Sequence, residues 1–335
     1  MTEAVTQIFK WVISFFLLAQ SSHCLSSQYE FAPQKPVRII VGFSVGSSPD
    51  LIARSIAPIL EKKFNQPVYV ENHTGGSGIS ALELVSKAPA DGQTILMATA
   101  SMFVINPEIF TTDSTLIEKR YKLLNSLKPV AALANIQYYL VANSKAQFQD
   151  FKSFINFAKM HPNQLNFGSS GVGTLPHIGV AIFNKRMEID VQHIPYQGSG
   201  QILNALLAGQ IDYYLDPGIA LSFVKAGKLR LLAIDAPKRN PEFPETPTLN
   251  ELGIRDFTFS SPQGFFIRKD TPDSITKSIH QTVNAAIKDK TYRTFIENMG
   301  HRTHPKSITQ FQQELNLQKR IINKEIKELK ITPNS

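Results

Sequence analysis

Short runs of branched apolar residues alternate along the chain with longer segments whose apolar residues recur at helical spacing. Residues 36–43 predict a buried strand, and a helix is expected to begin near Leu51. Strands at 68–71 and 94–98, with a helix at 79–87 between them, continue this pattern. Such alternation indicates a parallel sheet whose strands are joined by crossover helices.

A second alternating unit follows a long strand pattern at residues 130–141. Its expected strands lie at 165–167, 192–196, 212–216 and 229–234, with helices between them. Residues 260–267 predict a strand that returns to the first unit, and the chain ends in helices that are interrupted near 300–305.

Two such units, connected by two extended crossings, predict a two-lobed α/β fold with a cleft between the lobes. Each lobe is expected to be a mixed sheet flanked by helices. We assign residues 34–129 and 262–335 to lobe 1 and residues 130–261 to lobe 2. The crossings, near 130–142 and 258–268, are expected to form a hinge.

The composition is that of a soluble globular protein, with 42% hydrophobic and 19% charged residues, and 335 residues suffice for two cores. The formal net charge is +8, but the positive residues are scattered. Their densest group, at residues 319–330, alternates with glutamates, which is typical of a solvated helix face. We therefore expect no nucleic acid partner.

The first 27 residues have the organisation of a secretory signal peptide. Lys10 precedes an apolar stretch of about nine residues, and small polar residues follow it. The stretch is too short for a spanning helix, which needs about 20 apolar residues. We therefore expect an exported, periplasmic protein.

Cys24 is the only cysteine, so the rest of the chain can form neither a disulfide nor a thiolate metal site. Cys24 could carry a lipid anchor directly after the signal peptide. His23 is a poor residue at the position before cleavage, however, and this argues against lipidation.

Three segments share one construction, in which an apolar strand runs into a loop rich in glycine and serine and then into a helix. They are residues 43–50, 72–79 and 168–177. The first N–H groups of a helix have no partner within the helix, and the helix dipole places partial positive charge there. Such loops lie where open α/β sheets bind ligands. They predict an anion site between the lobes, although tight turns alone would require the same glycines.

The sequence Gly42-Phe43-Ser44-Val45-Gly46 also matches the nucleophile elbow of serine hydrolases. In that alternative Ser44 would be a nucleophile. An elbow serine normally follows several strands, whereas Ser44 follows the first one, and no His-Gly-Gly-Gly oxyanion segment precedes it. We expect the protein not to be an enzyme.

Neither a nucleotide site nor a metal centre is indicated, and we expect no cofactor. Residues 168–173 contain glycines at dinucleotide spacing in reversed order, without the Lys-Ser or Lys-Thr of a P-loop. His301 and His304 have no third ligand near them in the sequence, and Pro305 disrupts a helix there. His177 is retained as a candidate ligand contact because it lies in the first turn after the third loop.

Several motifs, taken in order, resemble the extracytoplasmic solute-binding receptors of tripartite tricarboxylate transporters, the Bug family. The motifs are Lys35-Pro-Val-Arg-Ile-Ile-Val41, Asp50 with Ile52-Ala-Arg54, Val70-Glu-Asn72, Lys87-Ala-Pro-Ala-Asp-Gly92, Ile105-Asn-Pro107, His193-Ile-Pro-Tyr196-x-Gly198, Ala208-Gly-Gln-Ile-Asp212 and Lys225-Ala-Gly-Lys-Leu-Arg230. Together they extend over nearly the whole expected mature chain.

The resemblance implies a two-lobed periplasmic-binding-protein fold, type II-like, that closes on a small carboxylate. It implies a monomer that delivers this ligand to membrane transporter subunits. Family members bind di- and tricarboxylates, acidic amino acids and some aromatic or amide compounds. A receptor that presents its ligand to a membrane sensor would use the same fold and is the alternative.

The resemblance also implies ligand contacts from one loop in each lobe. In the first loop these are Phe43, Ser44, Val45, Gly46, Ser47, Ser48 and Asp50. In lobe 2 they are Ser169, Ser170, Gly171 and Thr174, with Asp216 expected to face the cleft. Gly76, Ser101, His177 and Tyr196 complete the candidate set.

The first loop departs from the family pattern, which reads Pro-Phe-x-Ala-Gly-Gly-x-x-Asp. Gly42, Val45 and Ser47 stand in place of a proline, an alanine and a glycine. The loop is therefore bulkier and less flexible than the pattern implies.

Overall fold

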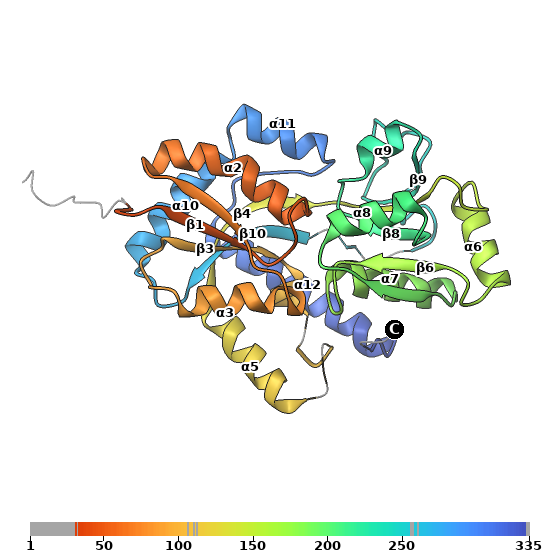
Figure 1. Ribbon diagram of the computed structural model, residues 1–335, viewed down its shortest axis with the longest axis horizontal. Helices are drawn as coiled ribbons and strands as arrows, with labels where there is room; N and C mark the ends of the chain where they lie inside the picture. The colour runs from red at the N-terminus through yellow and green to blue at the C-terminus, as the bar shows by residue number, and fades with distance from the viewer. Residues whose placement is uncertain are drawn as a thin grey trace, which may run out of the picture.

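The computed structural model describes residues 31, 33–105, 107–109, 111, 113–254, 258–259 and 261–332. The expected signal peptide and Cys24 lie outside the described residues. The described strands form two five-stranded sheets, each within its own half of the molecule (Figure 1). We call the half built on the first sheet lobe 1 and the other half lobe 2.

The sheet of lobe 1 has the strand order β2-β1-β3-β10-β4. Its strands are β1 (Val37–Val41), β2 (Val68–Asn72), β3 (Thr94–Thr99), β4 (Leu127–Ile136) and β10 (Ser261–Arg268). β1 is parallel to β2 and β3, whereas β10 is antiparallel to β3 and β4. Because helices cover both faces of the sheet, β1 is apolar on both sides, and Ile39 and Ile40 are fully buried.

The sheet of lobe 2 repeats this plan with the order β7-β6-β8-β5-β9. Its strands are β5 (Tyr138–Asn143), β6 (Asn166–Ser169), β7 (Gln192–Pro195), β8 (Tyr213–Asp216) and β9 (Leu229–Asp235). β6 is parallel to β7 and β8, and β5 is antiparallel to β8 and β9. In each lobe the antiparallel strand, β10 or β5, is the one that arrives along the chain from the other lobe. Two chain crossings therefore connect the lobes.

Helices cover both faces of each sheet. Lobe 1 contains α2 (Ser48–Phe64), η2 (Gly76–Gly78), α3 (Ile79–Lys87), α4 (Ser101–Val104), η3 (Pro107–Ile109), α5 (Ser114–Asn125), α10 (Asp273–Ala286), α11 (Lys290–Asn298) and α12 (Ile308–Glu328). Lobe 2 contains α6 (Phe151–Met160), α7 (Leu175–Met187), α8 (Ser199–Ala208) and α9 (Leu221–Lys225). In Figure 1, α2 and α11 lie above the first sheet, and α3 and α5 lie below it.

The C-terminal helix α12 contacts both lobes. It packs on α4, β4 and β10 in lobe 1 and on α7 in lobe 2. Arg186 Nη2 on α7 forms a 2.8 Å ion pair with Glu325 Oε1 on α12. The charge-rich segment that the sequence assigned to a solvated helix face does lie on this helix, where Lys324 pairs with Glu328 at 3.7 Å.

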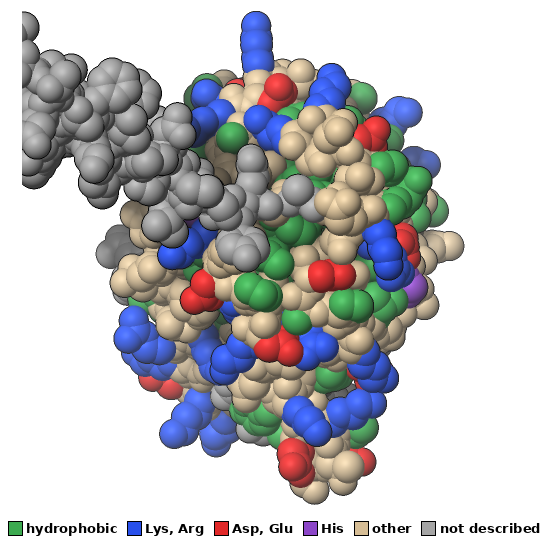
Figure 2. All heavy atoms as spheres, turned by 90° about the vertical axis from the view of Figure 1, so that its left-hand side faces the viewer, with side chains coloured by type: hydrophobic (Ala, Val, Ile, Leu, Met, Phe, Trp, Pro, Cys, Tyr) green, Lys and Arg blue, Asp and Glu red, His purple; other side chains and the backbone are tan. Residues whose placement is uncertain are grey.

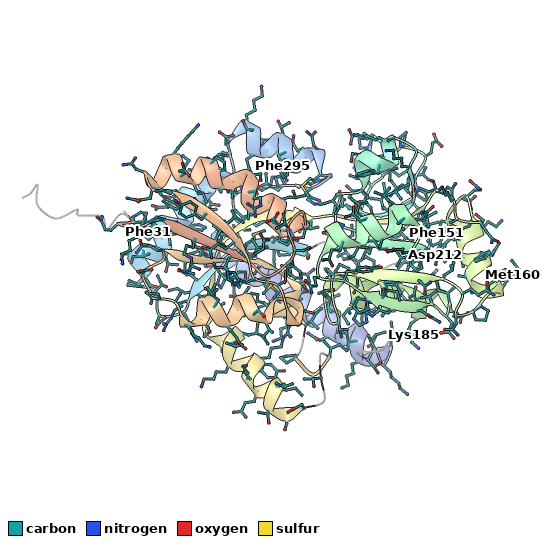
Figure 3. The ribbon with its side chains drawn as sticks, in the orientation of Figure 1. Phe31, Phe151, Met160, Lys185, Asp212 and Phe295 are labelled. Carbon is teal, nitrogen blue, oxygen red and sulfur yellow. The ribbon has the colours of Figure 1, made fainter. Side chains whose placement is uncertain are left out.

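The surface agrees with the scatter of charge along the sequence. On the outer end of lobe 1, Lys and Arg side chains are dispersed, with Asp and Glu among them (Figure 2). Phe31 and Met160 mark the two far ends of the molecule (Figure 3). Among the described helices, none is long and apolar enough to cross a bilayer.

Most elements agree with the sequence prediction, and the main difference is at the first crossing. The single strand expected at 130–141 is two strands, β4 and β5, separated by Gln137. β4 pairs with β10 in lobe 1, whereas β5 pairs within lobe 2. The expected boundary at residue 130 therefore cuts through β4. We propose Gln137 as the point where the chain passes between lobes.

Helix α5 was not identified from the sequence. Its N-cap Asp113 accepts hydrogen bonds from the N–H groups of Thr115 and Leu116. The helix packs on α3 at the edge of lobe 1.

Candidate functional site

A small cavity lies between the lobes, where the strands of both sheets end. Its volume is about 30 Å³, which is space for about two water molecules. Lobe 1 contributes Phe43, Ser47, Ser48, Pro49, Thr99, Ser101 and Gln263 to the lining, and lobe 2 contributes Tyr138, Ser170, Pro176, Ser199 and Pro217. We call this space the interlobe cavity. Every side chain in its lining is uncharged.

Three helices begin at the interlobe cavity. Ser48 is the first residue of α2, Ser199 is the first residue of α8, and Pro176 is the second residue of α7. Each helix N-terminus carries partial positive charge. The three dipoles therefore favour negative charge in the same small space.

Polar atoms with unused hydrogen-bonding capacity line the cavity. The hydroxyl groups of Ser47 and Ser48 are buried and have no hydrogen-bond partner within the described part of the chain. The same holds for the amide oxygen Oε1 of Gln263 on β10. Burial of an unsatisfied polar group costs about 1–3 kcal/mol. A polar guest in this cavity would recover that free energy.

Asp50 does not line the cavity but holds the first loop in shape. Its Oδ2 accepts a hydrogen bond from the Gly46 N–H at 2.9 Å. Its Oδ1 accepts from Arg54 Nε and from Asn72 Nδ2, both at 2.9 Å. Asn72 Nδ2 also donates to the carbonyl of Phe43 at 2.9 Å. Asp50 therefore stabilises the conformation of the first loop, and both of its carboxylate oxygens already accept hydrogen bonds from protein groups.

Two other residues of the first loop face away from the cavity. The side chain of Val45 is 68% exposed. Gly46 has φ of +77°, and a Cβ built there would meet no atom within 4 Å. The turn places both residues on the outer side of the loop, and Ser47 and Ser48 on the inner side.

The loop after β6 in lobe 2 contributes one expected residue, Ser170, to the lining. Its neighbours instead bond to one another. Ser169 Oγ lies 2.6 Å from His193 Nε2 and donates to the Gly171 carbonyl at 3.2 Å. Thr174 Oγ1 donates to the same carbonyl at 2.7 Å. These bonds fix the backbone that presents Ser170.

Two stacked imidazole rings pack against the loop after β6. The rings of His177 and His193 stack with centroids 4.2 Å apart. His177 is fully buried, and its Nδ1 accepts the Gly173 N–H at 3.1 Å. Burial, together with repulsion from His177, lowers the pKa of His193 to about 3. At neutral pH His193 is an uncharged packing group, and His177 does not line the cavity.

The second glycine-rich loop, residues 72–79, contacts lobe 2 at one side of the cleft. Ser77 Oγ, next to Gly76, donates to the Val172 carbonyl of lobe 2 at 2.6 Å. On the other side of the cavity, the Ser44 N–H donates to the Gln197 carbonyl at 3.2 Å, and the Ser48 N–H donates to Ser199 Oγ at 3.1 Å. These three hydrogen bonds join the lobes. The conformation is therefore closed.

Asp216 was expected to face the cleft, but its side chain is buried inside lobe 2. It accepts a hydrogen bond from the Tyr214 hydroxyl and another from the Ala220 N–H at 3.0 Å. Burial raises the pKa of Asp216 to about 7, although hydrogen bonds from Tyr214 and from the following turn act to lower it. The next residue, Pro217, lines the cavity instead.

The structure thus divides the expected contacts into two groups. Those that line the interlobe cavity are Phe43, Ser47, Ser48, Ser101 and Ser170. Those that do not are Ser44, Val45, Gly46, Asp50, Gly76, Ser169, Gly171, Thr174, His177, Tyr196 and Asp216. Most of the second group brace a loop or form the contact between the lobes. Tyr196 belongs to the support of the second-lobe loop, where its N–H donates to the Ser169 carbonyl at 2.8 Å.

Several lining residues were not identified from the sequence. Ser199 follows Gly198 at the start of α8, a glycine-serine step between a strand and a helix that could have been recognised. Tyr138 and Gln263 lie on the two crossing strands. Nothing local marks these two, because they reach the cavity only when both lobes are in place.

The site does not support the serine hydrolase alternative. Ser44 Oγ has no hydrogen-bond partner among the residues that the structure describes, so no base is in position to take its proton. In the same residues no group of His, Cys, Asp and Glu could hold a metal ion. What the arrangement can do is hold a small polar guest through uncharged groups.

A family model described as the tripartite tricarboxylate transporter family receptor matches residues 52–327. The chain belongs to this receptor family. The receptor is 29% identical over 289 residues to a UPF0065 protein of Bordetella pertussis (strain Tohama I), and the match covers 86% of each chain. It is 30% identical over 260 residues to Protein BugT of the same organism, a match that covers 77% of the receptor and 78% of BugT.

Solved structures share the fold of the receptor. The periplasmic binding protein BugD has a TM-score of 0.82 at 22% identity, covering 90% of the receptor and 99% of BugD. R. palustris Rpa4515 with adipate has a TM-score of 0.83 at 25% identity, with the same coverage. MatC (Rpa3494) from Rhodopseudomonas palustris with bound malate has a TM-score of 0.75 at 25% identity, covering 89% of the receptor and 98% of MatC.

Two expectations from the sequence are thereby confirmed. The receptor has the two-lobed α/β fold of periplasmic binding proteins. It is a solute-binding receptor and not an enzyme, because its family consists of such receptors.

Proposed function

We propose that this receptor captures a small carboxylate in the interlobe cavity, outside the cytoplasm, and delivers it to the membrane subunits of a tripartite tricarboxylate-type transporter. One observation carries the proposal. The N-termini of α2, α7 and α8 meet at a cavity where, among the residues that the structure describes, buried hydroxyl groups of the lining have no partner and no lining side chain is charged.

Uncharged dipoles suit a receptor that must bind an anion and then release it. A hydrogen bond to a charged group contributes about 1.5–3 kcal/mol net. Each helix N-terminus adds roughly 0.3–1 kcal/mol, and up to about 2 when partly buried. Four or five such contacts outweigh the ordering costs and reach the roughly 8 kcal/mol of micromolar binding. A lysine or arginine in the cavity would itself have to lose its hydration when the lobes closed.

The structural relatives support a carboxylate as ligand, since Rpa4515 was solved with adipate and MatC with malate. Both compounds are dicarboxylates and are larger than a cavity of about 30 Å³. The lobes therefore have to be further apart when a ligand of that size is bound. The conformation described here lies at the closed end of the motion.

The crossings are placed to permit this motion. Gln137 alone separates β4 from β5 at the first crossing, and the second crossing enters lobe 1 at β10, which begins at Ser261. Changes of φ and ψ at a few such residues let rigid lobes open and close around a ligand. In the proposed cycle the open receptor captures its ligand as a monomer, and the closed form docks on its membrane partners.

A test of this proposal measures binding by isothermal titration calorimetry with a panel of mono-, di- and tricarboxylates that includes malate and adipate. We expect the receptor to bind at least one compound with a Kd of about 1 μM. Ser48→Asp should abolish this binding, because a carboxylate at the start of α2 would occupy the space of the ligand and repel it. A loss of about 100-fold or more is expected.

Val45→Asp is the matched control, because it adds the same charge to the same loop on its exposed side. It should change the affinity by less than about threefold, since exposed charges are screened by water and salt. The proposal fails if Ser48→Asp binds as tightly as the unaltered receptor. It also fails if both variants lose affinity equally while their thermal unfolding is unchanged.

A further inference from the structure

A second and larger pocket lies between the lobes, with a volume of about 610 Å³. Lobe 2 supplies one wall through residues 238–242, which follow β9. Lobe 1 supplies the other through Arg293, Glu297 and Asn298 of α11 and through residues 300–304. Gln137 of the crossing lies between these walls. We call this space the rear pocket. Figure 3 labels Phe295 on α11, the helix that supplies three residues of the lining.

The rear pocket and the interlobe cavity lie on opposite sides of the first crossing, the extended chain that runs from β4 through Gln137 into β5. Successive side chains of an extended strand point to opposite faces. Gln137 lines the rear pocket, whereas the next residue, Tyr138, lines the interlobe cavity. Tyr139, which again points to the rear side, donates a hydrogen bond from its hydroxyl to the Gly300 carbonyl at 2.9 Å. The hinge therefore separates the two spaces.

The rear pocket is rich in positive charge. Lys238, Arg239, Arg293 and Arg302 line it, against two acidic residues, Glu242 and Glu297. Within the described part of the chain, Lys238 and Arg302 take part in no ion pair. These two unpaired cations lie on opposite walls, one from each lobe.

Acidic residues pair with two of the four cations, Arg239 with Glu251 and Arg293 with Glu297, but not with Lys238 or Arg302 among the described residues. Glu242 pairs with Lys225, which lies outside the pocket lining, at 2.8 Å. Glu297 is 3.6 Å from Arg293 on the same helix, and both side chains are more than half exposed. Such exposed pairs contribute little free energy and can be exchanged for a stronger partner.

We propose that the rear pocket binds a small polyanion, a molecule with two or more carboxylate or phosphate groups, between Lys238 and Arg302. The volume is within the range of about 300–1,000 Å³ that is usual for small-molecule sites. Two groups on one molecule would join the lobes across the pocket.

The position of the pocket behind the hinge couples its occupant to the ligand. When the lobes separate at the interlobe cavity, the bonds from Ser44 to Gln197 and from Ser77 to Val172 break, and the same rotation moves the walls of the rear pocket toward each other. The pocket is therefore widest when the cavity is closed. A molecule that fits the wide form stabilises the closed form by its difference in affinity for the two conformations.

The binding test uses tripolyphosphate as the probe, because it carries several negative charges and is too large for the closed interlobe cavity. Calorimetry at low salt compares the receptor with Lys238→Glu/Arg302→Glu. We expect the affinity to fall by about tenfold or more in this variant. The matched control is Lys319→Glu/Arg320→Glu on the exposed face of α12, which makes the same change of net charge with the same residue types.

The control should bind the probe within about threefold of the unaltered receptor. An equal loss in both variants would show that the probe responds only to net charge, and the proposal would fail. It would also fail if the unaltered receptor bound no probe. Neither outcome depends on a carboxylate binding in the interlobe cavity, so this test is separate from that of the proposed function.

The coupling to closure rests on the proposed function and has its own test. Ser44→Cys/Gly198→Cys, in a Cys24→Ser background, places two thiols across the contact between the lobes, and the disulfide holds the closed form. The oxidised variant should bind tripolyphosphate more tightly than its reduced form by about threefold or more. Equal or weaker binding after oxidation would contradict the coupling and leave the site itself in place.

Discussion

The two spaces that flank the hinge are built on opposite principles. The interlobe cavity is small, closed and lined only by uncharged groups, with three helix N-termini directed at it. The rear pocket is about 610 Å³ and is lined by lysine and arginine side chains from both lobes. One chain thus offers two different environments to negative charge, one on each side of Gln137.

The difference follows from the cost of desolvation. A group that is sealed between closed lobes loses its hydration, and for a buried ion this costs several kcal/mol unless its partners are well placed. Peptide dipoles and hydroxyl groups carry no net charge, so they can be enclosed at lower cost. In the rear pocket the cations keep much of their contact with water, and their attraction for an anion is weakened by salt. The first environment selects by geometry and the second by charge.

The largest effect is expected from a covalent link across the front of the cleft. In Ser44→Cys/Gly198→Cys the disulfide would hold the lobes at the closed end of the motion, where a dicarboxylate does not fit. We expect the affinity of the oxidised variant for the ligand, measured by calorimetry, to fall by about 100-fold or more and to recover with reductant. Unchanged affinity in the oxidised variant would show that the ligand does not enter through the interlobe opening.

A side chain at Gly198 should produce the next largest effect. A Cβ there would collide with Ser44 Oγ and lie 3.2 Å from the Ser44 nitrogen, and both atoms belong to the other lobe. The φ of Gly198 is 165°, which any residue adopts, so lobe 2 should tolerate the change. We expect Gly198→Val to weaken ligand binding by about 10–100-fold, because it opposes closure.

The thermal midpoint of the ligand-free Gly198→Val variant should stay within about 2 °C of the unaltered protein. Gly200→Ala should weaken ligand binding less than Gly198→Val does, because its Cβ would lie 3.3 Å from the Val45 carbonyl oxygen. A large drop in the midpoint of Gly198→Val would mean that the glycine serves the folding of lobe 2 and not closure.

Removal of a single hydroxyl group from the cavity should have a moderate effect. Ser47→Ala or Ser48→Ala takes away a hydrogen bond to the ligand worth about 1.5–3 kcal/mol, so we expect the affinity to fall by about 10–100-fold. Because neither hydroxyl has a protein partner in the described chain, the free energy of unfolding should not fall. Calorimetry and chemical denaturation test the two halves of this prediction.

Ser169→Ala provides the contrast. Its hydroxyl bonds to His193 and Gly171 and does not line the cavity. It should lose about 1–2 kcal/mol of stability. Its effect on ligand affinity should be smaller than that of Ser48→Ala. If the two variants behaved alike, the division between lining and bracing serines would be wrong.

The last prediction concerns pH and His301, which contacts the hinge residue Gln137. His301 is buried, accepts the Gln137 N–H at Nδ1 and lines the rear pocket. Burial lowers its pKa to about 4, from about 6.5 in the unfolded chain. Between these values the unfolded state binds the proton and the folded state does not, so stability falls as pH decreases from about 6.5 to about 4.

The slope due to His301 should approach about 1.4 kcal/mol per pH unit. His301→Gln should remove this part of the slope, as measured by urea denaturation at several pH values. A polyanion in the rear pocket should reduce it too, because negative charge raises the pKa of a nearby imidazole. An unchanged slope in His301→Gln would assign the acid sensitivity to other groups.

Local sequence was sufficient to predict most elements and the construction of the binding loops. The apolar run before Gly42 and the helical spacing after Leu51 correctly indicate β1 and α2. Ser47, Ser48 and Ser170 were expected contacts and line the cavity. Asp50 was correctly assigned to the first loop, but its role there is to bond to Gly46, Arg54 and Asn72. A pattern places a residue in a loop and does not say which way its side chain points.

By itself the sequence determined the alternation of strands and helices, the positions of the glycine-serine loops and the family of the chain. These depend on apolar periodicity and on backbone preferences that act over a few residues. Only the tertiary structure decided which loop residues meet. The break between β4 and β5 at Gln137, and the arrival of Gln263 and Tyr138 at the cavity, require two lobes positioned by strands that lie far apart in the sequence. The burial of Asp216 and the charged pocket behind the hinge are decided in the same way, because side chains from distant segments define both.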